Sequence, residues 1–201
     1  YSVFSIFNDG KQKELTVGLG IKFPIGSYND STPHIEPFSG QTYYTTKPLV
    51  MQNSSGATDI VFYSFYYQGY TAQQISFFAN AIYIKKGWNP LGEKLGDYAR
   101  LGIFASKKAG KFGLTLQLAA EWVDKMKINK DIEMYTFLNY DPEATGSRKL
   151  FVVPQVSYTI IDNLVMYGLY EIPVYQKVMK IQIASQVQAT IGISYRFSPK
   201  T

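Results

Sequence analysis

Residues 181–197 alternate between two kinds of side chain with a period of two. Ile, Val, Tyr and Phe fill most of the odd positions, whereas amide, hydroxyl and small side chains fill most of the even positions. This pattern is typical of a β-strand with a different environment on each face, in a soluble sheet or in a transmembrane barrel. Soluble strands average about five or six residues, whereas a membrane-spanning strand needs roughly nine to eleven. The length of this run therefore favours a strand that crosses a membrane.

Seven further segments have the length of a strand, and where the alternation is clear no charge falls in the middle of the apolar face. Residues 112–123 show the pattern best, because Leu114, Leu116 and Leu118 alternate with polar or small residues. Residues 58–68 leave both face assignments open, since Tyr and Phe occupy both sides. A half-solvated soluble sheet would carry many more Lys and Glu on its wet face. The other segments are residues 14–24, 73–85, 97–106, 150–161 and 164–174.

The connections between these segments alternate strictly between short and long. Outer-membrane barrels have this asymmetry, with tight periplasmic turns at one end and long extracellular loops at the other. A β-sandwich has no reason to sort its loops in this way. The sequence therefore predicts an all-β fold, an antiparallel up-and-down transmembrane β-barrel that residues 1–201 form as a single domain. The short connections are residues 8–12, 69–73, 107–111 and 161–163, and the long ones are residues 25–57, 86–96, 124–149 and 175–180.

The number of strands bears on the completeness of the barrel. Eight strands are visible, and residues 1–7 have the pattern of the end of a ninth. Bacterial single-chain barrels have even strand numbers and no open edge. We therefore expect the complete protein to have further N-terminal sequence and ten to twelve strands. An eight-stranded barrel would suffice if residues 1–7 lay outside the wall.

The composition excludes several classes of protein. This chain has no Cys, which rules out disulfides, thiolate metal sites and a Cys nucleophile within it. The formal net charge is +5, but the Lys residues fall in turns and loops and form no basic stripe. We expect attraction to anionic lipid head groups and no nucleic-acid partner. The charge-free stretch 60–84 would carry amides on all sides of a helix, which makes it a poor helical membrane span.

Ten charged or amide side chains fall on the polar faces, which a barrel directs into its lumen. One interpretation is a lumen that orients a polar group of a permeant. The other is a salt-bridged filling of a narrow barrel, which we favour because the lumen is small and unpaired buried charges are costly. The predicted lumen residues are Lys22, Arg100, Gln117, Glu121, Gln155, Glu171, Gln182, Gln186, Gln188 and Arg196.

Aromatic residues near strand ends on the apolar faces are predicted to form an interfacial girdle, with an aromatic ligand cage as the alternative. These residues are Trp122, Tyr170, Tyr195 and Phe197.

The loops contain few groups that catalysis would need. His34, the only His, stands among turn residues without the partners of a catalytic triad or a metal site. The carboxylates of residues 124–149 lack the spacing of an EF-hand, so we predict an extracellular loop that folds over the mouth or contacts a partner protein. We therefore expect no enzymatic activity, no catalytic residue, no metal and no cofactor.

The end of the chain resembles the assembly signal on the last strand of outer-membrane proteins. Thr190, Gly192, Tyr195 and Phe197 match its pattern of polar-x-Gly-x-x-aromatic-x-aromatic. The resemblance implies that the barrel-assembly machinery recognises this strand during insertion.

Five stretches in order are similar to one family of barrels, the MetA-pathway phenol-degradation or putative transporter family. The resemblance implies a barrel in the outer membrane of a Gram-negative bacterium, with several strands before Tyr1 and a role in the uptake of aromatic or apolar compounds. The stretches are "LTVGLGIKFPIGSYN", "KPLVMQNSSGATD", "LGDYARLGIFAS", "VVPQVSYTIIDNLVMYGLYEIPVYQ" and "GISYRF".

These observations leave three hypotheses. The first is a monomeric outer-membrane barrel, embedded in outer-membrane lipid, that passes a small apolar or aromatic molecule without covalent chemistry. The second is a structural or accessory barrel that docks beside other outer-membrane subunits and transports nothing. The third is a soluble lipocalin-like binder, in which the aliphatic rows would face an apolar cavity and Gln182, Gln186 and Gln188 would face water.

Overall fold

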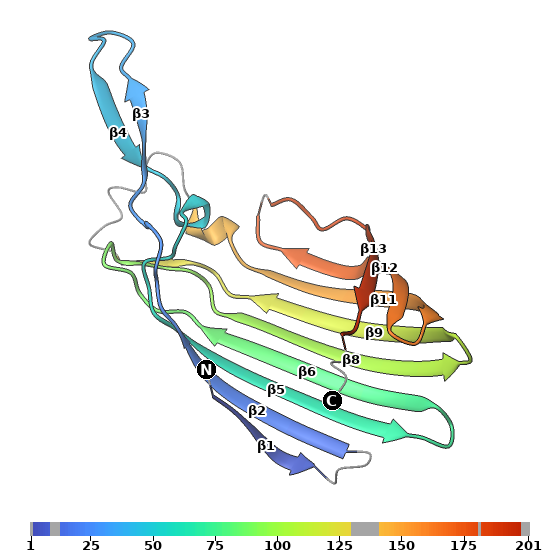
Figure 1. Ribbon diagram of the computed structural model, residues 1–201. Helices are drawn as coiled ribbons and strands as arrows, with labels where there is room; N and C mark the ends of the chain where they lie inside the picture. Colours follow the sequence, from blue (N-terminus) through green and yellow to red (C-terminus); the bar gives the residue numbers. More distant parts are fainter. Residues whose placement is uncertain (1, 9–12, 130–140, 181, 198–201) are drawn as a thin grey trace.

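The computed structural model describes residues 2–8, 13–129, 141–180 and 182–197, with the backbone alone for residues 2–8. Nine strands of the described residues form one antiparallel sheet, in which each strand lies beside the next one along the chain (Figure 1). This confirms the predicted all-β, up-and-down arrangement. In sheet order the strands are β1 (Ser2–Asn8), β2 (Lys13–Lys22), β5 (Asp59–Tyr70), β6 (Ile75–Lys85), β8 (Tyr98–Ala109), β9 (Phe112–Val123), β11 (Ser147–Ile161), β12 (Leu164–Val178) and β13 (Gln188–Tyr195).

The hairpin of β8 and β9 illustrates how local sequence sets the strand boundaries. Gly110 and Lys111 form its two-residue loop, and Gly110 has φ +59°, the left-handed conformation that such tight hairpin loops need. The alternation in residues 112–123 predicts β9 with the boundaries that it has. The predicted short connection 8–12 also separates two paired strands, although residues 9–12 lie outside the described part of the chain.

The last strand is shorter than predicted, and the prediction of a strand from residue 181 is wrong. β13 begins at Gln188, and residues 182–187 follow an irregular course. The side chain of Gln176 explains the difference, because its Oε1 accepts from Ser185 N at 2.7 Å and its Nε2 donates to Ser185 O at 2.8 Å. A side-chain amide thus takes the place of a strand neighbour.

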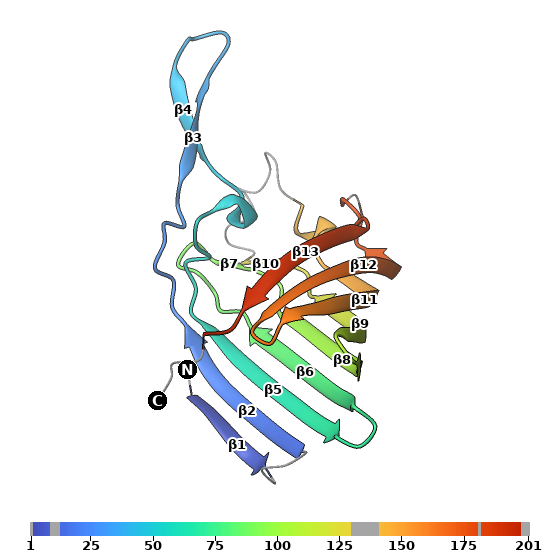
Figure 2. The same cartoon turned by 45° about the vertical axis from the view of Figure 1, so that its right-hand side comes forward.

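The two faces of the sheet have opposite character. Residues that are directly opposite on neighbouring strands share a face, so the register defines an inner face that includes Ala119 and Phe151 and an outer face that includes Leu116 and Leu118. Ala119 and Phe151 are buried, whereas Leu116 is 50% exposed and Leu118 is 48% exposed. Figure 2 shows that the sheet is strongly curled, and the buried face is its inner side. Long aliphatic side chains are therefore concentrated on the outer face, whereas the inner face combines small, polar and aromatic side chains with a few aliphatic ones such as Val153 and Leu169.

The sheet does not close into a barrel within the described residues. β1 and β13 are its two edges, and they run in the same direction because an even number of antiparallel steps separates them. Direct pairing of these edges would be parallel, unlike every other pair in the sheet.

The connections gather at two ends of the sheet, which we call the short-turn end and the long-loop end. The long loops contain short elements that the sequence patterns do not predict. A hairpin of β3 (Ser31–Ile35) and β4 (Thr42–Thr46) projects far from the sheet (Figure 1). The remaining elements are η1 (Leu49–Met51), β7 (Glu93–Lys94) paired with β10 (Lys127–Ile128), and η3 (Pro142–Ala144).

Candidate functional site

Four charged side chains from neighbouring strands meet on the inner face, and we call them the charged band. Arg100 of β8, Glu121 of β9 and Lys149 of β11 are direct cross-strand neighbours, and Glu171 of β12 completes the set. Arg100 Nη1 lies 3.8 Å from Glu121 Oε2, and Arg100 Nη2 lies 3.6 Å from Glu171 Oε2. Lys149 Nζ lies 3.8 Å from Glu121 Oε1. Arg100 and Glu171 therefore meet across two intervening strands, as expected on the inner side of a curled sheet.

The charged band is neutral and only partly hydrated. Two cations face two carboxylates, and all four side chains are partly buried. Tyr98 donates a hydrogen bond from its hydroxyl to Glu121 Oε2 at 3.2 Å. The ion-pair distances of 3.6–3.8 Å exceed the length of a direct hydrogen bond, so each charged group can also bind water or a polar ligand group beside its partner.

Aromatic rings cover the inner face on the neighbouring strands β5, β6 and β8. Phe78 and Phe104 stack with ring centroids 4.5 Å apart and an interplanar angle of 18°. Gly102 lies beside them, and a Cβ there would come within 2.8 Å of the Phe104 ring and 2.6 Å of Asn80 Oδ1. The glycine therefore makes space for the ring pair. The inner-face aromatic residues of these strands are Tyr63, Phe65, Tyr67, Phe78, Tyr98 and Phe104.

The register puts most of the predicted lumen residues on the inner face. Lys22 is opposite Asp59 in the register, but the carboxylate of Asp59 pairs with Lys86 instead, at 2.9 Å. The sequence pattern does not predict Lys149 as a lumen residue, because it predicts a strand that begins at Leu150. The signal was present, since Lys149 continues the alternation that leads to Phe151. The predicted residues on inner-face positions of strands are Lys22, Arg100, Gln117, Glu121, Gln155, Glu171 and Gln188.

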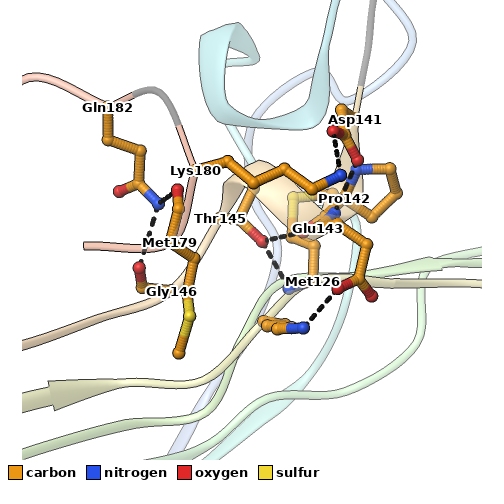
Figure 3. Close-up of polar contacts among 10 residues, drawn as sticks. Met126, Asp141, Pro142, Glu143, Thr145, Gly146, Met179, Lys180 and Gln182 are labelled. Atoms are coloured by element: carbon orange, nitrogen blue, oxygen red, sulfur yellow. Dashed lines mark hydrogen bonds and ion pairs between the residues drawn. The ribbon is translucent and has the colours of Figure 1, made fainter. Parts of the chain in front are cut away.

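Three predicted lumen residues lie outside the strands that were expected to place them. Gln182 and Gln186 belong to the irregular segment before β13, and Arg196 follows its last residue. Gln182 Nε2 donates to Gly146 O at 3.0 Å and to Met179 O at 2.9 Å, so its amide joins two connections (Figure 3).

The loops around Gln182 are held together by polar contacts at the long-loop end (Figure 3). Thr145 Oγ1 accepts from Met126 N at 2.8 Å and donates to Pro142 O at 2.6 Å. Lys180 Nζ lies 2.6 Å from Asp141 Oδ2, and Lys125 pairs with Glu143. The Lys180 ammonium lowers the pKa of Asp141 below its ordinary value. This part of the predicted loop 124–149 thus contacts the β12–β13 connection, while residues 130–140 lie outside the described chain.

A second ionic cluster joins the start of β5 to the connection between β6 and β8. Asp59 is completely buried and binds Lys86 Nζ and Gly87 N at 2.9 and 3.2 Å. Asp97 accepts from Lys86 N at 2.9 Å and lies 3.2 Å from the ammonium groups of Lys85 and Lys94. Burial alone would raise the pKa of Asp97, but these donors outweigh it and lower that pKa below its ordinary value.

The predicted girdle residues divide between the two ends and the middle of the outer face. Trp122 lies at the long-loop end, and Tyr195 lies at the short-turn end with its ring centroid 4.6 Å from that of Phe197. Tyr170 lies near the middle of β12, because this strand runs to Val178 instead of ending at residue 174. The assembly-signal residues Thr190, Gly192 and Tyr195 are in β13, and Phe197 follows it.

His34 is part of the projecting hairpin. Its Nε2 is 2.7 Å from Thr45 Oγ1, and its ring stacks on Tyr43 with centroids 5.4 Å apart. Among the described residues, no three His, Cys, Asp or Glu side chains gather as they would around a metal ion.

Comparisons with protein-family models, with curated proteins and with solved structures find no match to this chain. In the described part of the chain, no helix has both the length and the apolar character that crossing a membrane requires. The geometry of the two faces therefore carries the functional argument.

Proposed function

We propose that this chain forms the wall of a Gram-negative outer-membrane β-barrel that admits small apolar or aromatic compounds without covalent chemistry. The observation that carries the proposal is the inverted character of the sheet, with half-exposed aliphatic rows outside and a charged band inside. A water-soluble sheet buries its apolar face. A lipocalin-like binder would need the aliphatic rows inside.

The height of the outer apolar surface agrees with a membrane. On β9, Phe112 and Trp122 are ten residues apart and face outward at opposite ends, with Leu114, Leu116 and Leu118 between them. Ten residues span about 33 Å along a strand, and a tilt of roughly 40° reduces this to a height of about 25 Å. Transmembrane barrels have an apolar band of about this height between aromatic girdles.

Closure of such a barrel sets a condition on its edges. An open edge in a bilayer leaves backbone N–H and C=O groups without partners, which is very costly. Because β1 and β13 run in the same direction, an odd number of additional antiparallel strands joins them in the barrel that we propose. This agrees with the even strand number that the sequence leads us to expect.

The inner face supports an aromatic permeant. Stacked rings such as Phe78 and Phe104 offer a partner for an aromatic compound. The charged band on the same face has ion pairs longer than a direct hydrogen bond, so its charged groups can also bind a hydroxyl or carboxylate of the permeant. The family resemblance of the sequence leads to the same substrate class.

One feature favours the accessory barrel as a second candidate. The β3–β4 hairpin stands clear of the sheet, and its tip residue Phe38 is 97% exposed. Ile35 and Tyr44 of the same hairpin are also exposed. Exposed apolar groups on a projecting element are typical of protein contacts.

Flux measurements distinguish the two candidates. We expect the refolded protein to insert into liposomes and to admit a hydroxybenzoate, whose charge keeps it from crossing a bare bilayer. Gln155→Trp, on the inner face, is expected to reduce the flux severalfold, because it fills the path. Val156→Trp, on the outer face of the same strand, is the matched control and retains the wild-type flux. Insertion without flux of any small solute would favour the accessory barrel.

A further inference from the structure

We infer that the outer face has a binding site for a phosphate-bearing lipid, in which Arg148 and Lys177 hold the phosphate and a neighbouring groove holds an acyl chain. The inference rests on the proposed function, since it needs the outer face to meet lipid. It adds a ligand and a position at the long-loop end.

Two neighbouring cations mark one end of the proposed site. Arg148 of β11 and Lys177 of β12 are direct cross-strand neighbours, and both are exposed on the outer face. Like charges in this position repel, since their Cβ atoms are about 5 Å apart. Among the described residues, no carboxylate forms an ion pair with either side chain, although the adjacent Lys149 is paired with Glu121. An anion between Arg148 and Lys177 would relieve the repulsion.

A groove of about 1040 Å³ begins at Arg148 and crosses the outer face. Its lining residues come from two adjacent outer rows, and only the row of residues between them belongs to the inner face. Both small and larger apolar side chains line it. The small ones are Ser64, Ala81, Ala99 and Ala120, and the larger ones include Leu19, Phe62, Leu101, Trp122 and Leu150. A flexible alkyl chain fits such an apolar groove.

The boundary between groove and cations has the residues of a membrane interface. Trp122 is directly opposite Arg148 on the neighbouring strand, and Tyr175 of β12 lines the same end of the groove. Trp and Tyr favour the level of the lipid head groups, where one side of the ring is apolar and the other is wet. A lipid whose phosphate is next to an acyl chain matches this spatial order of cation, aromatic ring and apolar groove. An acidic peptide would match the cations and leave the groove empty.

Lipid binding to the refolded full chain in neutral detergent tests the inference. Native mass spectrometry measures how much phosphatidic acid the protein retains, in comparison with diacylglycerol of the same acyl length. We expect the wild type to prefer phosphatidic acid, and Arg148→Gln/Lys177→Gln to bind it about tenfold more weakly, the equivalent of one lost charge-assisted hydrogen bond. Lys107→Gln is the matched control, because Lys107 is exposed on the outer face at the short-turn end. This control is expected to bind as the wild type does.

Three results would overturn the inference. They are equal retention by the double variant and the wild type, equal retention of the two lipids, and binding of inorganic phosphate as tight as that of phosphatidic acid. Insertion of each variant into liposomes is measured in parallel. Insertion without lipid preference refutes this site alone, whereas failure of the wild type to insert refutes the proposed function.

Discussion

Each ionised side chain in the charged band has a partner of opposite sign, and Glu121, like Arg100, has two. Its carboxylate oxygens lie 3.8 Å from Arg100 and from Lys149. Removing one member of such a group leaves the others with uncompensated charge in a partly buried place, which costs more than the group contributes as a whole. Glu121 and Arg100 are therefore the residues on which the band most depends.

We expect Glu121→Gln to lower the free energy of unfolding by about 1–3 kcal/mol, because two cations lose their shared carboxylate. Urea unfolding of the refolded protein, followed by Tyr and Trp fluorescence, measures the change. Glu121→Gln/Lys149→Gln removes a cation together with its partner and should recover part of the loss. If the double variant lost more free energy of unfolding than Glu121→Gln and Lys149→Gln lose together, the pairing that we describe would not hold.

For the individual elements, period-two alternation predicts well where a strand lies along the chain. It predicts less well which face of an aromatic-rich strand points inward. β9 has the predicted boundaries because its two faces meet uniform environments along its whole length. The faces of β5 could not be assigned from sequence, since Tyr63 and Phe65 point in while Phe62 and Tyr66 point out. Aromatic residues suit both the packed inner face and the outer girdle.

The structural features that the sequence patterns do not predict have a common cause, because contacts between residues distant in the sequence determine them. β13 loses its first half to the side chain of Gln176, a residue of another strand. The pairing of β7 with β10 and the clusters around Asp59 and Asp97 join separate connections. Alternation carries no information about such contacts, although an Asp at each of these two strand starts was a visible signal.

The Asp97 cluster predicts an acid-sensitive element. Because the pKa of Asp97 is lowered on folding, the carboxylate stabilises the fold fully above its unfolded pKa, and this contribution is lost as the pH falls through the lower folded pKa. We expect Asp97→Asn to be less stable than the wild type at neutral pH and to lose less stability on acidification toward pH values below about 4. Urea midpoints across this range measure the effect.

Ser106→Ala, which changes no titratable group, is the control and should keep the wild-type dependence on pH. A variant Asp97→Asn that lost stability with acid as steeply as the wild type would show that other carboxylates account for the acid sensitivity.

For the whole molecule, the decisive property is which face meets the surroundings. Ile191, on the outer face in the middle of the edge strand β13, is 83% exposed, while Ala119 on the inner face of β9 is fully buried. A sheet of this kind in water would expose a broad apolar surface, which soluble proteins avoid. In the hydrocarbon core of a bilayer, the same apolar surface needs no other protein to cover it.

Leu116→Lys tests the environment of the outer face. Leu116 lies midway between Phe112 and Trp122, so a Lys there would sit near the midplane of the bilayer and cost about 2–4 kcal/mol. We expect a marked fall in the fraction of protein that folds into liposomes, measured by the mobility of unheated samples in gels. Gln117→Lys, one residue further on the inner face, should fold nearly as well as the wild type. Equal folding of both variants would place the outer face in water.

The different character of the two faces also restricts how the chain can change over generations. Adding or deleting one residue inside β9 or β11 would exchange inward and outward side chains for the rest of that strand, so that leucines would crowd the charged band. Changes of length within the strands are therefore tolerated in multiples of two, or where a bulge restores the phase. The connections at the long-loop end are free of this rule, and new segments are most easily gained there.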